Sequence, residues 1–446
     1  ALEVDEGLQL LEVFFARHLH HLSSYTPPAG PLRFISSPVN LAVFTVIFVT
    51  FPIMALPNLP SVRKLLRRPK PGSGDFTWDL EEYVPGNKLA LFFRGEALYA
   101  AMAEAIENAR ETVHLETYIF SGDKTGRAFA ELLLRAAKRG VRTRLIYDSV
   151  GSIDLDPTLE TRMRNGGVNI LEYHPMAPWR PRWAWNKRAH RKILICDGKI
   201  GFIGGMNISD DHAPKSSGGL DWPDAHARVE GPAAYDLDRL FRAVWHKETG
   251  RWFDSHGHPE FVRGAASVKI VGNHEILKRF VIRETYVNAL RAAQRDVAIA
   301  NSYFIPDWRI RRSLAQAVRR GVRVRVLVPG RSDILSAWYA MRSTYTSLLS
   351  RGVRIFEWQG PMMHAKAVVV DGRWCAVGSY NLDHRSLRHN LEANLQTLDE
   401  RFTAELGARF ERGVEGAKEI TLADWRRRPL LERALEKFWA SFDYFF

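Results

Sequence analysis

Two stretches of the chain repeat the same order of apolar and polar positions. Residues 109–148 and residues 293–330 each begin with a short apolar run that favours a strand. Leu, Ala and Phe then recur every three or four residues, the spacing of a helix face, up to a basic turn that ends in Gly140 or Gly321. A second apolar run follows. The pattern predicts strand, helix and strand in each half, and hence α/β units with largely parallel sheets covered by helices.

The first 75 residues follow a different pattern. Apolar positions at helical spacing in residues 2–22 predict an amphipathic helix, which fits packing on the protein or lying on a membrane. Residues 34–62 carry no charge, and residues 41–56 are almost wholly apolar. This run is shorter than the ~20 residues of a spanning helix. The cations of residues 63–70 suit an anionic, cytoplasmic leaflet. We therefore expect a membrane-associating segment, as either a span or an interfacial helix.

The other end of the chain has a similar composition. Residues 421–446 join three consecutive arginines to an apolar stripe at helical spacing. Burial against the body and a second interfacial anchor both fit this pattern. The stripe consists of Leu430, Leu431, Leu435, Phe438, Trp439, Phe442 and Phe446.

Composition and charge narrow the class of protein. The chain has 446 residues, of which 46% are hydrophobic and 25% charged, values that exclude a disordered chain, a collagenous repeat and a polytopic membrane protein. The formal net charge of +13 favours an anionic partner, either nucleic acid or anionic lipid. Only Cys196 and Cys375 are present, so neither a disulfide framework nor a cysteine zinc site is expected.

One motif occurs twice with the same spacing. The segment HRKILICDGKIGFIGGMN begins at residue 190, and HAKAVVVDGRWCAVGSYN begins at residue 364. A single H-x-K-x-x-x-x-D arises by chance at roughly one position in 8,000, whereas two copies that both continue to Gly-x-x-Asn are specific. The matching residues are His190, Lys192, Asp197 and Asn207 in the first copy, and His364, Lys366, Asp371 and Asn381 in the second.

The motif combines groups that can act on a phosphodiester. Residues two apart on a strand point to the same face, so each His should emerge beside its Lys. The Lys offers positive charge, the Asn directed hydrogen bonds, and the His a nitrogen that titrates near neutrality. Two such half-sites face to face would need no metal. Asp197 and Asp371 precede Gly, which suits the turn after a strand, so we expect a structural or supporting role for both.

At these residues the chain resembles the phospholipase D superfamily, whose signature is the doubled H-x-K-x-x-x-x-D motif. The segments NKRAHRKILICDGKIGFIGGMNISDDH, WPDAHARVEGP and VGSYNLDHRSLRHNLEANL are similar to bacterial cardiolipin synthases, most of all the shorter type without a long N-terminal membrane hairpin. The resemblance extends from about Gly86 to the C-terminus. It implies an α/β fold of two duplicated phospholipase D-like halves, each a mixed β-sheet flanked by helices, with the site between them.

We expect three segments on this basis. Residues 1–75 would hold the amphipathic helix, the apolar membrane-associating segment and a basic linker. Residues 76–260 would form the first half, and residues 261–446 the second half with the C-terminal amphipathic segment.

The resemblance also implies a reaction and its partners. A phosphatidyl group would pass from one phosphatidylglycerol to another through a phosphatidyl-histidine, with release of glycerol and without a cofactor. The partners would be phosphatidylglycerol and cardiolipin at a membrane surface, and no nucleic acid. The site would lie on the cytoplasmic side of the bacterial inner membrane. Another phospholipase D-type phosphodiesterase, either a phospholipase D or a nuclease, is the alternative, because the aromatic and basic residues of WRPRWAWNKR would suit a nucleic-acid backbone as well as a lipid headgroup.

The roles of individual residues follow from the same resemblance. His190 and His364 would be nucleophile and general acid/base, with His190 the expected nucleophile. Gly205 stands in the first half where Ser379 stands in the second, so the half-sites should differ. The implied catalytic set is His190, Lys192, Asp197, His364, Lys366 and Asp371, and the implied substrate-binding set is Asn207, Ser379 and Asn381.

Two carboxylates are expected behind the histidines. Family members place an acidic residue against the outer nitrogen of each His, and Asp224 and Glu392 are the matching candidates. We expect each to serve the histidine of its own half: Asp224 with His190, and Glu392 with His364. Such a carboxylate would fix the tautomer of the imidazole and stabilise its cationic form.

Overall fold

The computed structural model describes residues 68–175, 186–253, 262–273 and 279–442, which belong to one compact unit. The predicted amphipathic helix, the apolar run and most of the basic cluster lie outside the described residues, as does the predicted boundary between the halves. Within the described ranges, no helix combines the length and apolar character that crossing a bilayer requires.

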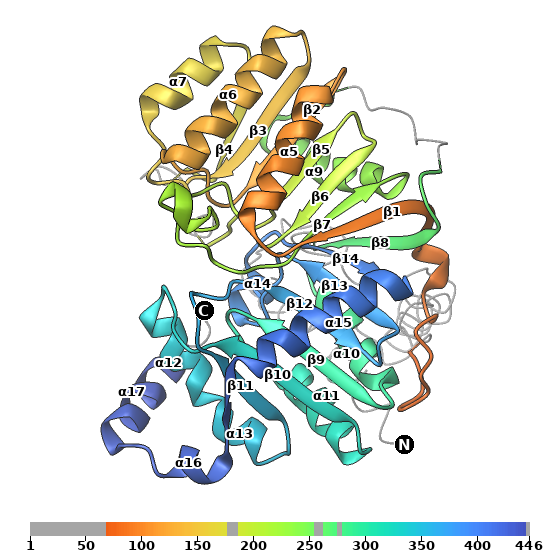
Figure 1. Cartoon of the computed structure of the whole chain (residues 1–446), viewed down its shortest axis with the longest axis vertical. Helices are drawn as coiled ribbons and strands as arrows, with labels where there is room; N and C mark the ends of the chain where they lie inside the picture. The colour runs from red at the N-terminus through yellow and green to blue at the C-terminus, as the bar shows by residue number, and fades with distance from the viewer. Residues whose placement is uncertain (1–67, 176–185, 254–261, 274–278, 443–446) are drawn as a thin grey trace, which may run out of the picture. The chain divides into compact units, whose positions relative to one another are not determined.

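The strands form a single mixed sheet of fifteen, with the order β15-β11-β10-β9-β12-β13-β14-β8-β1-β7-β6-β5-β2-β3-β4 (Figure 1). The first half contributes β1 (Val84–Phe92), β2 (Thr112–Thr117), β3 (Arg142–Asp148), β4 (Asn169–Tyr173), β5 (Ile193–Cys196), β6 (Ile200–Gly204) and β7 (His226–Glu230). The second half contributes β8 (Ala266–Gly272), β9 (Asp296–Asn301), β10 (Arg323–Pro329), β11 (Arg354–Trp358), β12 (Lys366–Val370), β13 (Trp374–Gly378), β14 (Ala393–Thr397) and β15 (Ala417–Ile420).

The strand order confirms the duplication. Reading outward from the centre, the first half runs β1-β7-β6-β5-β2-β3-β4 and the second β8-β14-β13-β12-β9-β10-β11. In both, two parallel pairs lie farther from the centre than the antiparallel pairs of this series. In the second half, β15 adds an antiparallel strand at the outer edge. The predicted α/β fold of two duplicated halves is thus confirmed. The two sheets are also joined into one, because the edge strands β1 and β8 pair antiparallel.

Helices cover both faces of the sheet (Figure 1). The first half has α5 (Gly95–Asn108), α6 (Lys124–Lys138), α7 (Pro157–Asn165) and α9 (Ala233–Thr249). The second has α10 (Val281–Ala292), α11 (Trp308–Arg319), α12 (Leu335–Ser343), α13 (Tyr345–Leu349), α14 (His384–Arg388), α15 (Glu400–Glu415), α16 (Leu422–Arg426) and α17 (Leu430–Ala440). Short 3-10 turns lie at Leu80–Glu82 and Lys215–Ser217.

The repeated sequence pattern produces the expected units, β2-α6-β3 and β9-α11-β10. Asp123 begins α6 by accepting from the backbone N–H of Gly126, and Asp307 begins α11 in the same manner, so each satisfies a helix N–H that has no helical partner. Gly140 and Gly321 follow the helix ends with φ of 85° and 86°, the left-handed conformation that only Gly adopts without strain.

One hydrophobic core is shared by both halves. It contains Leu237 and Phe241 of α9 together with Phe402 and Leu406 of α15, and α9 packs on β8 while α15 packs on β1. One helix of each half therefore packs on a strand of the other half. This shared packing fixes the position of one half on the other, which a site built from both halves requires.

Two aspartates of the doubled motif anchor turns rather than face the histidines. Asp371 follows the last residue of β12, whereas His364 precedes its first, so the two lie at opposite ends of the strand. Asp371 accepts from the backbone N–H groups of Gln294, Arg295 and Asp296 at 2.8–2.9 Å. Its φ is 56°, which Asp tolerates better than most residues.

Asp197 does the same in the first half. It follows β5 and accepts from the N–H groups of Arg110, Glu111 and Thr112. Asp197 and Asp371 therefore do not belong to the catalytic set. Their side chains connect the end of one strand to the start of the neighbouring strand, which is a structural role.

We expect Asp371→Asn to lower the free energy of unfolding by about 1–3 kcal/mol, because an amide retains the left-handed backbone but loses charge-assisted bonds to three N–H groups. Urea unfolding followed by circular dichroism would measure the loss. Asp154→Asn, at an exposed position, is the matched control. Equal midpoints for the two variants would contradict the anchoring role.

Candidate active site

Both motif histidines are held by the backbone of the opposite half. The N–H of His190 donates to the carbonyl of Leu391 at 3.0 Å, and the N–H of His364 donates to the carbonyl of Pro223 at 2.8 Å. The buried guanidinium of Arg191, next to His190, donates to the carbonyl of Asn273 in the second half. The site is thus assembled where the two halves meet.

The carboxylates are paired across the halves. His190 Nδ1 lies 2.9 Å from Glu392 Oε1, and His364 Nδ1 lies 2.8 Å from Asp224 Oδ2. The matching of each carboxylate with the histidine of its own half is therefore wrong. Asp224 lies just before β7 and Glu392 just before β14, the strands next to the central pair β1 and β8, and from there each side chain reaches into the other half.

Each dyad defines the tautomer of its imidazole. An ionised carboxylate can only accept, so Nδ1 carries the proton and Nε2 keeps its lone pair. Burial lowers the pKa of His190 well below its usual value, and the ammonium of Lys192 lowers it further. Burial and the ammonium of Lys366 act on the pKa of His364 in the same direction. The free enzyme therefore holds neutral imidazoles with Nε2 as a base or nucleophile.

The two carboxylates are supported differently. Glu392 accepts from the hydroxyls of Ser379 and Ser386 and from the amide of Asn390, and burial raises its pKa to about 7. Asp224 accepts from the N–H of Ala225 and lines an apolar pocket between the sheet and α15. Burial raises the pKa of Asp224 to about 6.

One position explains this difference. A Cβ at Gly205 would lie 2.3 Å from Asp224 Oδ1, so the carboxylate occupies the space that a side chain would need. The equivalent Ser379 has a hydroxyl that donates to Glu392. The expected inequality of the half-sites is present, and its cause is the volume that Asp224 occupies.

The two lysines lie beside their histidines, as strand alternation predicts. Lys192 Nζ donates to the carbonyl of His190 at 2.7 Å, and Lys366 Nζ donates to the hydroxyl of Ser302 at 2.8 Å. Both lysines are buried. Burial lowers the pKa of Lys192 to about 7 and that of Lys366 to about 8.

Both asparagines are oriented by their oxygen atoms. Asn381 Oδ1 accepts from the hydroxyl of Ser302, and Asn207 Oδ1 accepts from the N–H of Ile119. In the part of the chain that the structure describes, no bond occupies either amide NH₂, so these donors are available to an anion. The arrangement offers two imidazoles, two ammonium groups and two amides to one phosphate.

Comparison with known proteins agrees with this geometry. A family model described as cardiolipin synthase, PLD-like domain, matches residues 102–217 and 286–414, which contain both motifs. The chain belongs to this family of phospholipase D-like enzymes. Asp224 lies just beyond the first matched range, whereas Glu392 lies within the second.

Relatives and solved structures support the assignment. A cardiolipin synthase of a Geobacillus species is 34% identical over 346 residues, which cover 77% of this chain and 69% of the relative. Cardiolipin synthase A of Pseudomonas putida is 35% identical over 355 residues, covering 78% and 73%. The crystal structure of phosphatidylserine synthase from Haemophilus influenzae shares the fold, with a TM-score of 0.63 at 12% identity over 80% of this chain and 95% of that one.

Two tyrosines beside the histidines were not predicted. The ring of Tyr118 lies 5.0 Å from that of His190, with Lys192 Nζ 5.2 Å from the tyrosine ring, and Tyr303 lies in the equivalent place against His364. A signal was present in the sequence, because both repeats of this phospholipase D-like enzyme end their first strand with a Tyr-containing aromatic pair. Such a pair is common in cores, so the pattern alone does not point to a site.

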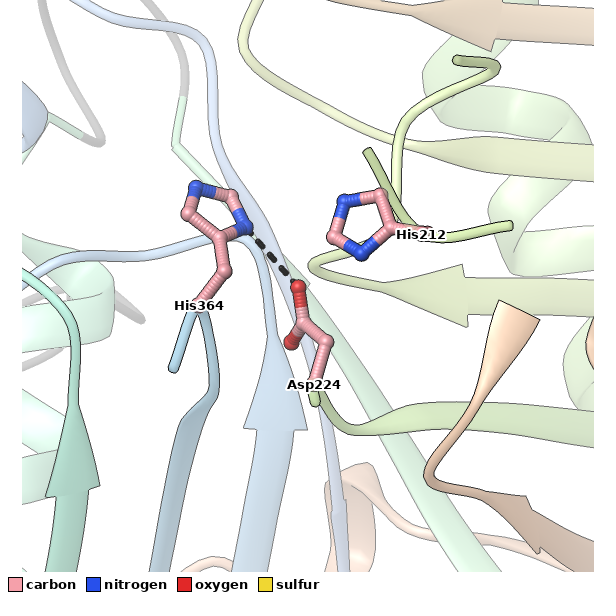
Figure 2. A group of neighbouring side chains, drawn as sticks. All are labelled: His212, Asp224 and His364. Atoms are coloured by element: carbon pink, nitrogen blue, oxygen red, sulfur yellow. Dashed lines mark hydrogen bonds and ion pairs between the residues drawn. The ribbon is translucent and has the colours of Figure 1, made fainter. Parts of the chain in front are cut away.

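A third histidine lies next to the second dyad. Figure 2 shows the rings of His212 and His364 on either side of the Asp224 carboxylate, and the two ring centres are 5.7 Å apart. Burial lowers the pKa of His212 to about 4. Of the described residues, these three form the group that could hold a metal ion, with donor atoms within 4.8 Å of one another. Two imidazoles and a carboxylate suit Zn²⁺, but binding would displace the hydrogen bond of the dyad.

The crossed pairing is open to a direct test. We expect Glu392→Gln to change the ring ¹⁵N chemical shifts of His190 and to leave those of His364 in place, because an amide cannot replace the charge against Nδ1. Asp224→Asn should have the reverse effect. Spectra of histidine-labelled protein, assigned with His190→Asn and His364→Asn, would measure both. A response of the histidine in the same half would contradict the crossed geometry.

Proposed function

We propose that this phospholipase D-like enzyme makes cardiolipin, by moving a phosphatidyl group from one phosphatidylglycerol to another. The observation that carries the proposal is the pair of crossed dyads, each with a lysine beside it. A double displacement at one phosphorus needs a nucleophile, a proton donor and cations, and all of these are present without a cofactor. The names of the relatives support the same activity.

The first step would break the phosphodiester of the donor lipid. His190 Nε2 attacks phosphorus and forms a P–N bond, while the bond from phosphorus to the glycerol headgroup oxygen breaks. His364 takes up a proton at Nε2 when the anionic phosphodiester binds beside it, because the negative charge raises the pKa of the imidazole. It gives this proton to the headgroup oxygen, and glycerol leaves. Asp224 stabilises the imidazolium before the transfer, and Glu392 stabilises the cationic phosphatidyl-His190.

The second step would reverse these roles. His364, now neutral, takes the proton from a headgroup hydroxyl of the second phosphatidylglycerol, whose oxygen attacks phosphorus. The P–N bond to His190 breaks, and cardiolipin leaves. Lys192, Lys366 and the two amides hold the phosphoryl oxygens in both steps. Ser379 donates a hydrogen bond to Glu392. It would act on the reaction by orienting that carboxylate, or its hydroxyl would rotate to bind the phosphate directly.

A group of cations near His190 supports an anionic acceptor. Burial lowers the pKa of half-buried His389, and four positive side chains lower it further. One of them, Arg385, also acts on His190. A second phosphate would be attracted to this place, whereas water or a short alcohol would gain nothing from it. The cations are Lys187, Arg279, Arg385 and Arg388.

We place the reaction at the inner face of a bacterial cell membrane. The net charge of +13 and the anionic substrates favour this location. The segment of residues 1–75 is proposed to hold the enzyme there, as a span or as an interfacial helix.

The decisive experiment supplies phosphatidylglycerol vesicles to the full chain in the presence of EDTA. We expect one glycerol for each cardiolipin. We also expect a phosphatidyl group on His190 in protein denatured with detergent at neutral pH, because the P–N bond is labile in acid. His190→Asn and His364→Asn should both be inactive, with Asp154→Asn as control. Strict dependence on a divalent metal would contradict the mechanism. Phosphatidic acid as the sole product would indicate a phospholipase D, and digestion of DNA without lipid turnover a nuclease.

The low pKa of Lys192 predicts a pH effect. In the free enzyme this ammonium is lost as the pH rises through about 7, and with it part of the charge that binds phosphate. The profile of kcat/KM should be bell-shaped. In Lys192→Arg the alkaline limb should shift upward by about one pH unit, toward the pKa of Lys366, because a guanidinium stays charged. Lys199→Arg, at an exposed position, is the control. An unshifted limb would contradict this role for Lys192.

A further inference from the structure

Helix α17 buries one carboxylate, that of Glu436, against the protein, whereas the side chain of Glu432 stays partly exposed. Glu436 is 4% exposed and forms ion pairs with Arg342 and Arg428, while Glu432 pairs with Arg342 at 3.2 Å. Arg342 lies on α12, against which α17 packs, and is itself buried. Arg342 also pairs with Glu357 of β11, and its ion pair with the buried Glu436 keeps that side of α17 against the protein.

The apolar side of the same helix is left outside. Leu430 is 77% exposed, Leu431 71%, Phe438 54%, and Phe442, just beyond the helix, 40%. An ordinary surface helix buries such residues and exposes its glutamates. Trp439 alone packs on the core of the second half as the sequence stripe predicts. The stripe is therefore divided: Trp439 faces the body, Leu435 is partly exposed, and Leu430, Leu431, Phe438 and Phe442 form an exposed patch.

Exposed cations lie on α17 and in the short segment before it. Arg426, Arg427, Arg433 and Lys437 are exposed, and none has a carboxylate partner within residues 68–442 as described. Apolar side chains rimmed by unpaired cations are the combination that an anionic bilayer binds, because the rings and leucines enter the acyl boundary while the cations meet the headgroups. A protein partner of the same kind would have to supply both an apolar groove and a ring of acids.

We propose that α17 docks on an anionic lipid surface through Leu430, Leu431, Phe438 and Phe442, with Arg426, Arg427, Arg433 and Lys437 at the headgroups. The ion pairs of Glu432 and Glu436 with Arg342 hold the helix in this inverted orientation. The proposed contact does not involve the dyads, so its test does not depend on turnover.

A local reporter tests the docking in the full chain. A polarity-sensitive dye would be attached through Lys437→Cys, since Cys196 and Cys375 are buried and free. Vesicles of phosphatidylglycerol should shift the emission to the blue, vesicles of phosphatidylcholine should not, and salt should weaken the shift. The same dye at Lys199→Cys, an exposed position in the first half, is the control.

Two fourfold variants test whether lipid binding depends on this surface or on exposed apolar residues anywhere on the protein. Changing Leu430, Leu431, Phe438 and Phe442 together to Ser should raise the lipid concentration at half-maximal shift at least tenfold. The matched variant changes Ile153, Leu220, Trp252 and Val262, which are equally exposed, and should change it less than twofold. No shift with phosphatidylglycerol, or an equal shift with phosphatidylcholine, would overturn the proposal. A blue shift that grows with protein concentration in the absence of vesicles would instead indicate a second copy of the chain, and would also overturn it.

Discussion

The histidine–carboxylate pairs that cross between the halves are the constraint on which the site depends. Glu392 and Asp224 have fully buried side chains, and a buried carboxylate is costly unless it is paired and hydrogen-bonded. Neither half can meet this requirement alone, because each carboxylate finds its imidazole in the other half. The shared core of α9 and α15, the pairing of β1 with β8 and the buried Arg191 all serve to keep these partners in register. Assembly of the fold and assembly of the site are therefore the same event.

Duplication brings two half-sites together, and in this chain they differ. One histidine must attack while the other carries a proton; two equivalent histidines could share that proton by coupling, whereas unequal surroundings favour it on one of them. The difference begins at a single position, where Gly205 leaves room for Asp224 and Ser379 instead donates to Glu392. A second difference is His212, which lies on the other side of the Asp224 carboxylate from His364 (Figure 2). A small change in volume within a duplicated framework is enough to give the two dyads different surroundings.

Burial shapes the electrostatics of this centre more than any single charge. It lowers the pKa of both histidines and both lysines and raises that of both carboxylates. In the free enzyme burial therefore disfavours the charged form of each of these groups. An entering phosphate would raise the pKa of both lysines and favour their ammonium forms. A different arrangement is found at α17, where buried Glu436 and partly exposed Glu432 both pair with Arg342 while leucine and phenylalanine side chains stay exposed.

The sequence by itself determined the duplication, the α/β units and the residues at the centre of the site. Those properties are encoded locally: the period of apolar positions sets each strand and helix, and the two-residue spacing places Lys192 beside His190 just before β5 begins. The turn role of Asp197 and Asp371 was also readable, because Asp-Gly after a strand has few other uses.

Only the tertiary structure decided which carboxylate serves which histidine. Spacing along the chain favours a partner in the same half, whereas the antiparallel pairing of β1 with β8 brings β7 and β14 close to the opposite half. The same holds for α17, whose stripe indicates an amphipathic helix but not the side that faces the protein. That side depends on Arg342, a residue about ninety positions earlier in the chain that requires its carboxylates. Periodicity records which residues share a face, and only packing against a distant charge fixes where that face points.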